Sequence, residues 1–135
     1  KKHKRKTKKT KNQKTQQKNK MGPDFIMLSG NDENAYEFNL KGGVGCISVS
    51  ANVAPKLCSD FQNFSNSKRN EDAKALFDKL LPLHDILFIE SNPSPAKYSL
   101  SLMKMMSDEV RFPLVVLESA SRKKIDTVLK NLKLI

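Results

Sequence analysis

The stretch that decides the fold is Gly42-Gly43-Val44-Gly45-Cys46-Ile47-Ser48-Val49, in which a glycine pair precedes a short apolar run. An apolar run of this length is typical of a buried strand in a parallel sheet. The glycine pair predicts the end of a helix, because glycine readily adopts the left-handed conformation that a helix C-cap requires. We therefore expect a strand over residues 44–49 that directly follows a helix.

A second apolar run lies upstream of this stretch. Phe25-Ile26-Met27-Leu28 precedes Ser29-Gly30 and predicts another buried strand. The residues between the two strands can form a helix that Asn31 or Asp32 caps. Two strands joined by a short helix form a βαβ unit, which predicts a parallel sheet with a right-handed crossover. Strands buried on both faces need neighbours, so this segment is expected to belong to a larger sheet.

Beyond Pro55 the sequence predicts helices almost to the end of the chain. An amphipathic stretch runs from Glu71 to about Ile89, and Pro82 inside it predicts a kink or a break. Residues 110–117 are mostly apolar and contain a proline, which is typical of a connecting segment or an edge strand.

Two further helices are predicted from their caps. Asn92 is expected to cap a helix that has Pro93 at its first position and extends to about Met106. Ser119 or Ser121 is expected to cap the last helix. The apolar residues of that helix recur at helical spacing and predict its packing face: Ile125, Val128, Leu129 and Leu132.

The net charge of +11 is confined to the N-terminal residues. Residues 1–20 contain ten lysines, Arg5 and no acidic residue, whereas residues 21–135 contain equal numbers of basic and acidic residues. Without apolar residues, residues 1–20 are expected to form a disordered basic tail. The rest of the chain has the composition of a globular protein.

The basic tail has three interpretations. It can be an off-frame translation, because its residue types can all be encoded by adenine-rich codons. It can be a nucleic-acid-binding arm, because lysines that neutralise phosphates release counterions. It can also be a solvated tail. No aromatic residue interrupts residues 1–20, so stacking on bases is not available and sequence-specific reading of nucleic acid is not expected.

The cysteines and histidines exclude several kinds of site. Cys46 and Cys58 are expected to be reduced, buried residues, since no secretory segment precedes them. With only His3 and His84 as histidines, no zinc-ligand spacing can be assembled, and neither a metal nor a cofactor is expected. His84 is expected to be a structural histidine, and Tyr36 and Tyr98 are expected to be residues that pack helices together. The apolar runs are too short to span a bilayer, so a soluble, cytoplasmic protein is predicted.

Four ordered blocks resemble the dihydrodipicolinate synthase family, and the resemblance covers roughly residues 22–135. The blocks are Leu28-Ser29-Gly30-Asn31-Asp32, the stretch 42–55 that contains Gly-Gly-Val-Gly, Leu80-Leu81-Pro82-Leu83-His84, and Phe88-Ile89-Glu90-Ser91-Asn92-Pro93-Ser94-Pro95-Ala96-Lys97.

The resemblance implies an α/β fold that is the C-terminal part of a (β/α)₈ TIM barrel. Residues 21–66 would form the seventh and eighth strands with their flanking helices, and residues 67–135 the helical C-terminal domain. A complete barrel typically needs roughly 250 residues, more than the 135 present.

The resemblance also implies a chemistry: pyruvate, held as a Schiff base on a lysine, condenses with aspartate semialdehyde in lysine and diaminopimelate biosynthesis. Ile47 would line the pyruvate pocket with its backbone, Gly30 would leave room for the keto acid, and Asn92 would lie beside the pocket. Each residue also has a structural interpretation: Ile47 as a core residue, Gly30 as part of a tight turn and Asn92 as the helix cap.

The family's Schiff-base lysine precedes the Ser-Gly turn by some two dozen residues, which falls near Arg5, where no matching block exists. The relay tyrosine would also lie upstream, so no catalytic residue is assigned. We therefore expect a C-terminal fragment of the synthase that is inactive alone, in a family whose complete enzymes are homotetramers. A separately encoded N-terminal half could complete the barrel. The competing hypothesis is a basic-tailed protein that binds nucleic acid or an anionic surface.

Overall fold

The two predicted strands pair in parallel at the start of the described chain. The structure is a computed structural model, and it describes residues 20–22 and 24–135. The predictions for the basic tail therefore lie outside the described residues, apart from Lys20. Strand β1 (Leu28–Ser29) pairs with β2 (Gly45–Cys46), with Leu28 opposite Gly45 and Ser29 opposite Cys46.

The connection between the strands is helical, as predicted. It contains the 3-10 helix η1 (Asp32–Asn34) and helix α2 (Ala35–Asn39). The side chain of Asn31 caps η1 by accepting a 2.9 Å hydrogen bond from the Glu33 N–H. Gly42 follows α2 with a φ of +88°, and a Cβ at Gly43 would overlap the Phe38 ring. Both glycines are therefore required where the chain turns from α2 into β2.

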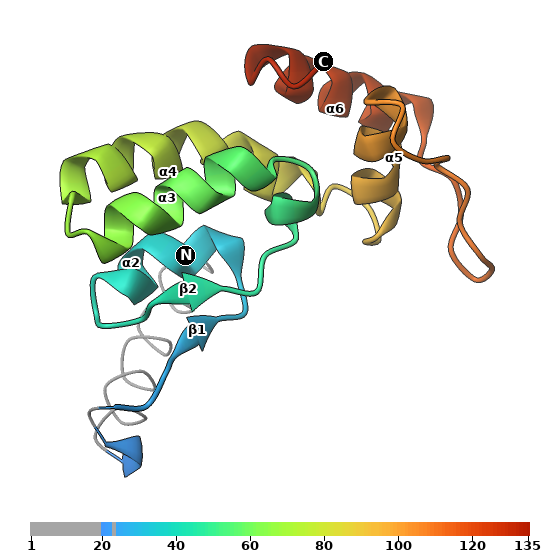
Figure 1. Cartoon of the computed structure of the whole chain (residues 1–135). Helices are drawn as coiled ribbons and strands as arrows, with labels where there is room; N and C mark the ends of the chain where they lie inside the picture. Colours follow the sequence, from blue (N-terminus) through green and yellow to red (C-terminus); the bar gives the residue numbers. More distant parts are fainter. Residues whose placement is uncertain (1–19, 23) are drawn as a thin grey trace, which may run out of the picture.

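The strands are buried on one face only, so the prediction of burial on both faces is wrong for the described structure. Met27 is 5% exposed, whereas Ile26 is 72% and Leu28 48% exposed. Helices α2, α3 and α4 lie on one side of the two-stranded sheet in Figure 1, and no other described element covers the opposite side. Alternate side chains of a strand point to opposite faces, so one set of apolar side chains remains exposed.

Helices α3 (Pro55–Asn66) and α4 (Asn70–Ile86) form a hairpin and lie side by side (Figure 1). The short 3-10 helix η2 (Ser50–Asn52) leads from β2 into α3. Phe61 and Phe77 join the two long helices, with ring centroids 5.6 Å apart. Helix α4 is continuous across Pro82, so the alternative in which this proline splits the helix is wrong.

Helices α5 (Ser94–Leu102) and α6 (Ser119–Asn131) pack together, and α6 also packs on α4. The predicted face of α6 is confirmed: Ile125 and Leu129 are fully buried, Leu132 is buried and Val128 is half-buried. One continuous apolar core joins the residues of α3, α4, α5 and α6.

The predicted starts of α5 and α6 are wrong. Helix α5 begins at Ser94, with Pro95 in its first turn, and it ends at Leu102, so Asn92 lies outside the helix. Glu118 occupies the cap position of α6, and no side chain caps that helix. The backbone N–H of Glu118 instead donates a 3.1 Å hydrogen bond to the Glu90 carboxylate, so a contact between distant residues fixes this helix start.

Residues 103–118 form a connecting segment without a strand, which confirms one of the two alternatives for 110–117. We call this stretch the 103–118 segment. Among the described helices, none combines the length and the apolar character needed to cross a membrane.

Candidate functional site

The candidate site is a pocket of about 270 Å³ beyond the C-terminal end of β2. Ile47 and Asn92, which sequence analysis singled out separately, both line it. The remaining lining residues come from the turn and η2 after β2, and from α5 and the residue before it: Ser48, Val49, Asn52, Pro93, Ala96, Lys97 and Leu100. The fold thus brings together two of the three predicted site residues.

The backbone of β1 holds Ile47 at this pocket. The Ile47 N–H donates a 2.8 Å hydrogen bond to the Ser29 carbonyl, directly beyond the paired residues of the two strands. The Ile47 side chain is 69% exposed. Ile47 is therefore not a core residue in the described structure, and its structural interpretation is wrong there.

Gly30 follows Ser29 and does not line the pocket. A Cβ added at Gly30 would meet no atom within 4 Å, and Gly30 does not have a positive φ. Neither close packing nor a left-handed backbone therefore requires glycine at this position. The space beside Gly30 is open, in contrast with the crowded position of Gly43.

Asp32 holds the turn that carries the pocket residues. Its buried carboxylate accepts hydrogen bonds from the backbone N–H groups of Val49, at 2.9 Å, and Ser50, at 3.2 Å. Asp32 follows β1 and these two residues follow β2, so one side chain links the C-terminal ends of the two strands. The sequence pattern predicted Asp32 only as a possible helix cap and did not indicate this role.

Burial of Cys46 and the neighbouring Asp32 charge raise the pKa of the Cys46 thiol to about 12. The same two causes raise the pKa of Cys58 to about 11. Both cysteines are free, as predicted, and both are protonated near neutral pH. Because the thiolate is the nucleophilic form, neither cysteine is suited to nucleophilic catalysis.

His84 extends this network to α4. Its Nδ1 lies 2.7 Å from the Ser50 Oγ, and its ring lies 5.9 Å from the Phe77 ring. Burial lowers the pKa of His84 below its ordinary value of 6.5, against the opposing effect of nearby acids. A buried, hydrogen-bonded histidine outside the pocket confirms the prediction of a structural role. No group of three His, Cys, Asp or Glu side chains in the described residues could hold a metal ion.

The lowered pKa of His84 predicts a pH-dependent stability. Below about pH 6.5 the unfolded chain binds a proton at this position, whereas the folded chain does not until the pH reaches the lower folded-state pKa. The free energy of unfolding is therefore expected to decrease as the pH is lowered across this window. The His84→Gln variant can still form a hydrogen bond with Ser50. Its free energy of unfolding, measured in urea over the same pH range, is expected to decrease less than that of the parent chain. Parallel curves for the two proteins would contradict this assignment.

Both tyrosines pack between helices, as predicted. The Tyr36 ring stacks on Phe77 with centroids 5.6 Å apart. Tyr98 is buried, and its hydroxyl donates a 3.0 Å hydrogen bond to Asp126 on α6. Burial and the hydrogen bond to Asp126 raise the pKa of Tyr98.

Two lysines of the described chain, Lys41 and Lys97, differ in their position relative to the pocket. Lys41 lies in the turn before β2, at the opposite end of the strand from the pocket, and pairs with Glu37 at 3.7 Å. Lys97 lies on α5 as expected, but it lines the pocket. Helical spacing alone could not reveal this, because the pocket depends on how α5 meets the turn after β2.

Comparison with known proteins gives one consistent family. The model of the dihydrodipicolinate synthetase family matches residues 4–132. The 4-hydroxy-tetrahydrodipicolinate synthase of Pelagibacter ubique is 59% identical over 103 residues, which cover 74% of this chain and 35% of that protein. The chain thus spans well under half the length of such curated relatives.

Two solved structures match with high similarity. The dihydrodipicolinate synthase of Thermotoga maritima has a TM-score of 0.81 and 38% identity, over 83% of this chain and 38% of that one. The chloride-inhibited dihydrodipicolinate synthase of Acinetobacter baumannii, complexed with pyruvate, has a TM-score of 0.79 and 40% identity, over 82% of this chain and 38% of that one.

Proposed function

Because this chain belongs to the dihydrodipicolinate synthetase family, we propose that it serves as the C-terminal part of a 4-hydroxy-tetrahydrodipicolinate synthase. Residues 21–66 contribute the seventh and eighth barrel strands, and residues 67–135 contribute the helical C-terminal domain. The observation that carries the proposal is the meeting of Ile47 and Asn92 in one pocket beyond the end of β2. Active sites of α/β barrels lie at this end of the strands.

In the proposed enzyme, pyruvate forms a Schiff base with a lysine and then condenses with aspartate semialdehyde. The backbone of Ile47 lines the pyruvate pocket, where its N–H is fixed by the Ser29 carbonyl. Gly30 does not line the described pocket, but the space around it is open, and we propose that it leaves room for the keto acid where further barrel strands complete the site. Asn92 lines the same pocket as Ile47.

The nucleophilic lysine of this proposal belongs to the sixth strand and is none of the described residues. Lys41 lies at the wrong end of β2, and Lys97 projects from a helix. Covalent catalysis through a Schiff base requires this nucleophile. We therefore propose that a polypeptide of residues 1–135 has no synthase activity by itself.

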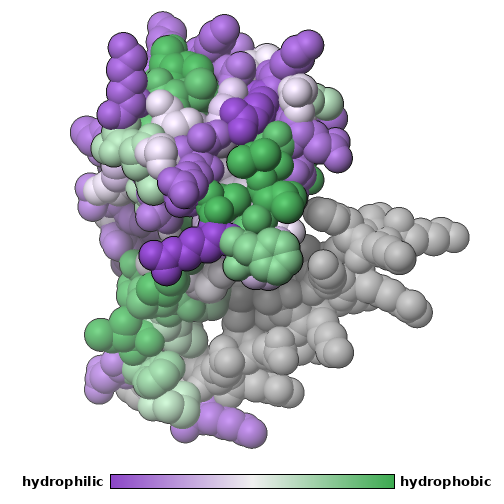
Figure 2. All heavy atoms as spheres, turned by 90° about the vertical axis from the view of Figure 1, so that its right-hand side faces the viewer, coloured by the Kyte–Doolittle hydropathy of each residue, from purple (hydrophilic) through white to green (hydrophobic). Residues whose placement is uncertain are grey.

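The exposed apolar side chains of the strands support docking of further barrel strands. Besides Ile26 and Leu28 on β1 and its approach, Val44 and Ile47 are exposed at β2. Figure 2 shows patches of hydrophobic residues at the surface, beside hydrophilic ones, on the face that it draws. Contiguous apolar surface of this kind marks an interaction site, and an unpaired strand edge can accept another strand.

The proposal predicts a difference between the polypeptide alone and a completed barrel. After treatment with pyruvate and borohydride, residues 1–135 alone are expected to show no adduct by intact-protein mass spectrometry. Co-expression with the N-terminal part of the Pelagibacter ubique synthase is expected to give a complex that condenses pyruvate with aspartate semialdehyde. That complex should carry one trapped adduct, on the N-terminal polypeptide. An adduct on the lone chain, or two polypeptides that do not assemble, would contradict the proposal.

A variant at Gly30 distinguishes an effect on the binding site from an effect on the stability of the fold. Gly30→Val is expected to leave the unfolding curve of the chain almost unchanged, because a Cβ at this position meets no atom within 4 Å. In the completed barrel the same variant is expected to abolish adduct formation, since the added bulk occupies the space of the keto acid. Equal trapping in Gly30→Val and the parent protein would remove Gly30 from the site.

A further inference from the structure

The 103–118 segment carries apolar side chains that the rest of the described chain leaves in solvent. Phe112 is 93% exposed, the highest value among the exposed large apolar side chains of residues 20–22 and 24–135. Val115 and Val116 follow it, at 68% and 60% exposed. Single exposed apolar residues are ordinary, but a cluster within residues 112–116 is typical of an interaction surface. We call these three residues the Phe112 surface.

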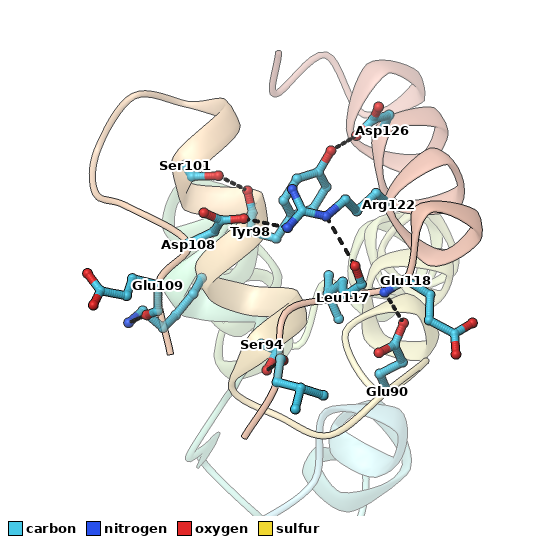
Figure 3. Close-up of polar contacts among 12 residues, drawn as sticks. Glu90, Ser94, Tyr98, Ser101, Asp108, Glu109, Leu117, Glu118, Arg122 and Asp126 are labelled. Carbon is cyan, nitrogen blue, oxygen red and sulfur yellow. Dashed lines mark hydrogen bonds and ion pairs between the residues drawn. The ribbon is translucent and has the colours of Figure 1, made fainter. Parts of the chain in front are cut away.

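Contacts with α5 and α6 fix the backbone around the Phe112 surface (Figure 3). Arg122 on α6 pairs with Asp108 at 2.8 Å, and its Nε donates a 3.3 Å hydrogen bond to the Leu117 carbonyl. Ser94 at the start of α5 donates a 3.1 Å hydrogen bond to the Val115 carbonyl. The apolar side chains are therefore presented on a loop that is held in place, and they do not fold back onto the core.

Arg122 is itself held between α5 and α6. Its guanidinium lies over the Tyr98 ring, 4.6 Å from the ring centroid. The Tyr98 hydroxyl in turn donates a hydrogen bond to Asp126 (Figure 3). Arg122 thus connects the packing of the two helices to the position of the 103–118 segment.

The 103–118 segment lies beside the pocket beyond β2. Lys97, which lines that pocket, donates a hydrogen bond to the Glu109 carbonyl in the segment. In an α/β barrel, the loops that follow all the strands gather at this end of the sheet. The chain covers only 35% of the length of the Pelagibacter ubique synthase. The loops of the strands that this chain does not contribute would therefore meet near the Phe112 surface.

We propose that the Phe112 surface docks on the N-terminal part of the synthase, against apolar side chains of the loops that follow its barrel strands. This inference rests on the proposed function, and it adds a contact area on the helical domain to the strand docking at β1 and β2. Exposed Glu109 and Arg111 precede the surface, which gives it the apolar centre and charged rim of a protein interface. Arg122 is a positioning residue for this contact.

The size of the Phe112 surface favours this partner over a second copy of the chain. A stable interface buries about 800 Å² on each partner, far more than three side chains supply. The surface therefore suits one part of a larger contact. Docking of the N-terminal part supplies the remainder, because the same polypeptide also covers the exposed apolar side chains at β1 and β2.

Alkylation of an introduced thiol measures whether the surface becomes covered. The two native thiols, Cys46 and Cys58, have pKa values of about 12 and 11 and stay protonated near neutral pH. The thiol of Val116→Cys is expected to react about tenfold more slowly in the complex with the N-terminal part of the Pelagibacter ubique synthase than in the lone chain, because reactivity follows exposure. Ile135→Cys, 43% exposed at the far end of α6, is the control and should react equally in both.

Replacement of Phe112 separates docking from stability. Phe112→Ser is expected to leave urea unfolding of the lone chain unchanged, since the side chain is already exposed. The same variant is expected to raise the dissociation constant of the complex roughly thirtyfold, as loss of an aromatic anchor does. Ile135→Ser should change neither. Arg122→Gln is expected to weaken the complex in the parent chain but to add little in Phe112→Ser, because Arg122 acts through the same surface.

The outcomes distinguish this inference from the proposed function. Equal affinity of Phe112→Ser and the parent chain, or an unprotected thiol in the complex, would overturn the docking and leave the proposed function standing. Protection that appears in the lone chain as its concentration rises would assign the surface to a second copy, which also overturns it. A parent chain that does not bind the N-terminal part would contradict both proposals. A complex that forms but traps no pyruvate would contradict the proposed function alone.

Discussion

Replacement of Leu83 by alanine is expected to lower the free energy of unfolding by about 3 kcal/mol. Leu83 is fully buried in the last turn of α4, a helix that packs on both α3 and α6. Removal of its side chain takes away apolar contacts and leaves a cavity that the surrounding helices fill only in part. Since small domains are stable by only about 5–15 kcal/mol, such a loss is a large fraction of the total.

Urea unfolding followed by circular dichroism measures this loss. Leu40→Ala is the matched control: the same atoms are removed, but Leu40 is 49% exposed. The control is expected to lose less than half as much stability, because partial exposure leaves less burial to lose. Equal losses in the two variants would mean that α4 is not the centre of the core.

The regular parts of this fold could be predicted from the sequence because they depend on local spacing. The apolar face of α6 recurs at helical positions, and Ile125 and Leu129 are fully buried as predicted. The βαβ unit was predicted from two apolar runs and the glycine pair, and Gly42 has the expected left-handed backbone.

The helix starts and the strand burial could not be predicted in the same way. The cap of α6 depends on a hydrogen bond between Glu118 and the distant Glu90, which no local pattern contains. An apolar run such as Phe25–Leu28 has the same sequence pattern whether one face or both faces of the strand are covered. Burial of a strand depends on its neighbours, and the described elements cover one face only.

The candidate site shows the same division. Ile47 and Asn92 could be singled out through the resemblance of short blocks, but their meeting in one pocket follows from how α5 packs near the turn after β2. Lys97 was missed as a pocket residue because its place there depends on how α5 meets the turn after β2. Asp32 was missed because it acts through backbone groups of a distant segment, the two N–H groups after β2. Such contacts between side chain and backbone leave no characteristic pair of residue types in a sequence.

Replacement of Asp32 by alanine is expected to cost about 3 kcal/mol of unfolding free energy, since two hydrogen bonds to a charged, buried acceptor are lost. The N–H of Ser50, a fully buried residue, would then lack its partner, which adds a desolvation cost. Asp32→Asn keeps the shape and one acceptor oxygen, so it is expected to lose only about 1–2 kcal/mol. Asp85→Asn, at an exposed position on α4, is the control and should be nearly neutral.

The thiol of Cys46 gives a second, independent measurement of the Asp32 charge. Burial is the larger cause of its raised pKa of about 12, and the charge of Asp32 is the next. In Asp32→Asn the charge is gone but the burial remains, so the pKa of Cys46 is expected to fall while staying above its ordinary value of 9.0. Alkylation rates measured against pH, in a Cys58→Ser background, would follow this change. A merely destabilised chain would react faster at every pH, whereas loss of the Asp32 charge moves the midpoint of the profile to lower pH. An unchanged midpoint would mean that Asp32 does not act on Cys46 through its charge, and its role at the strand ends would then rest on the two backbone hydrogen bonds alone.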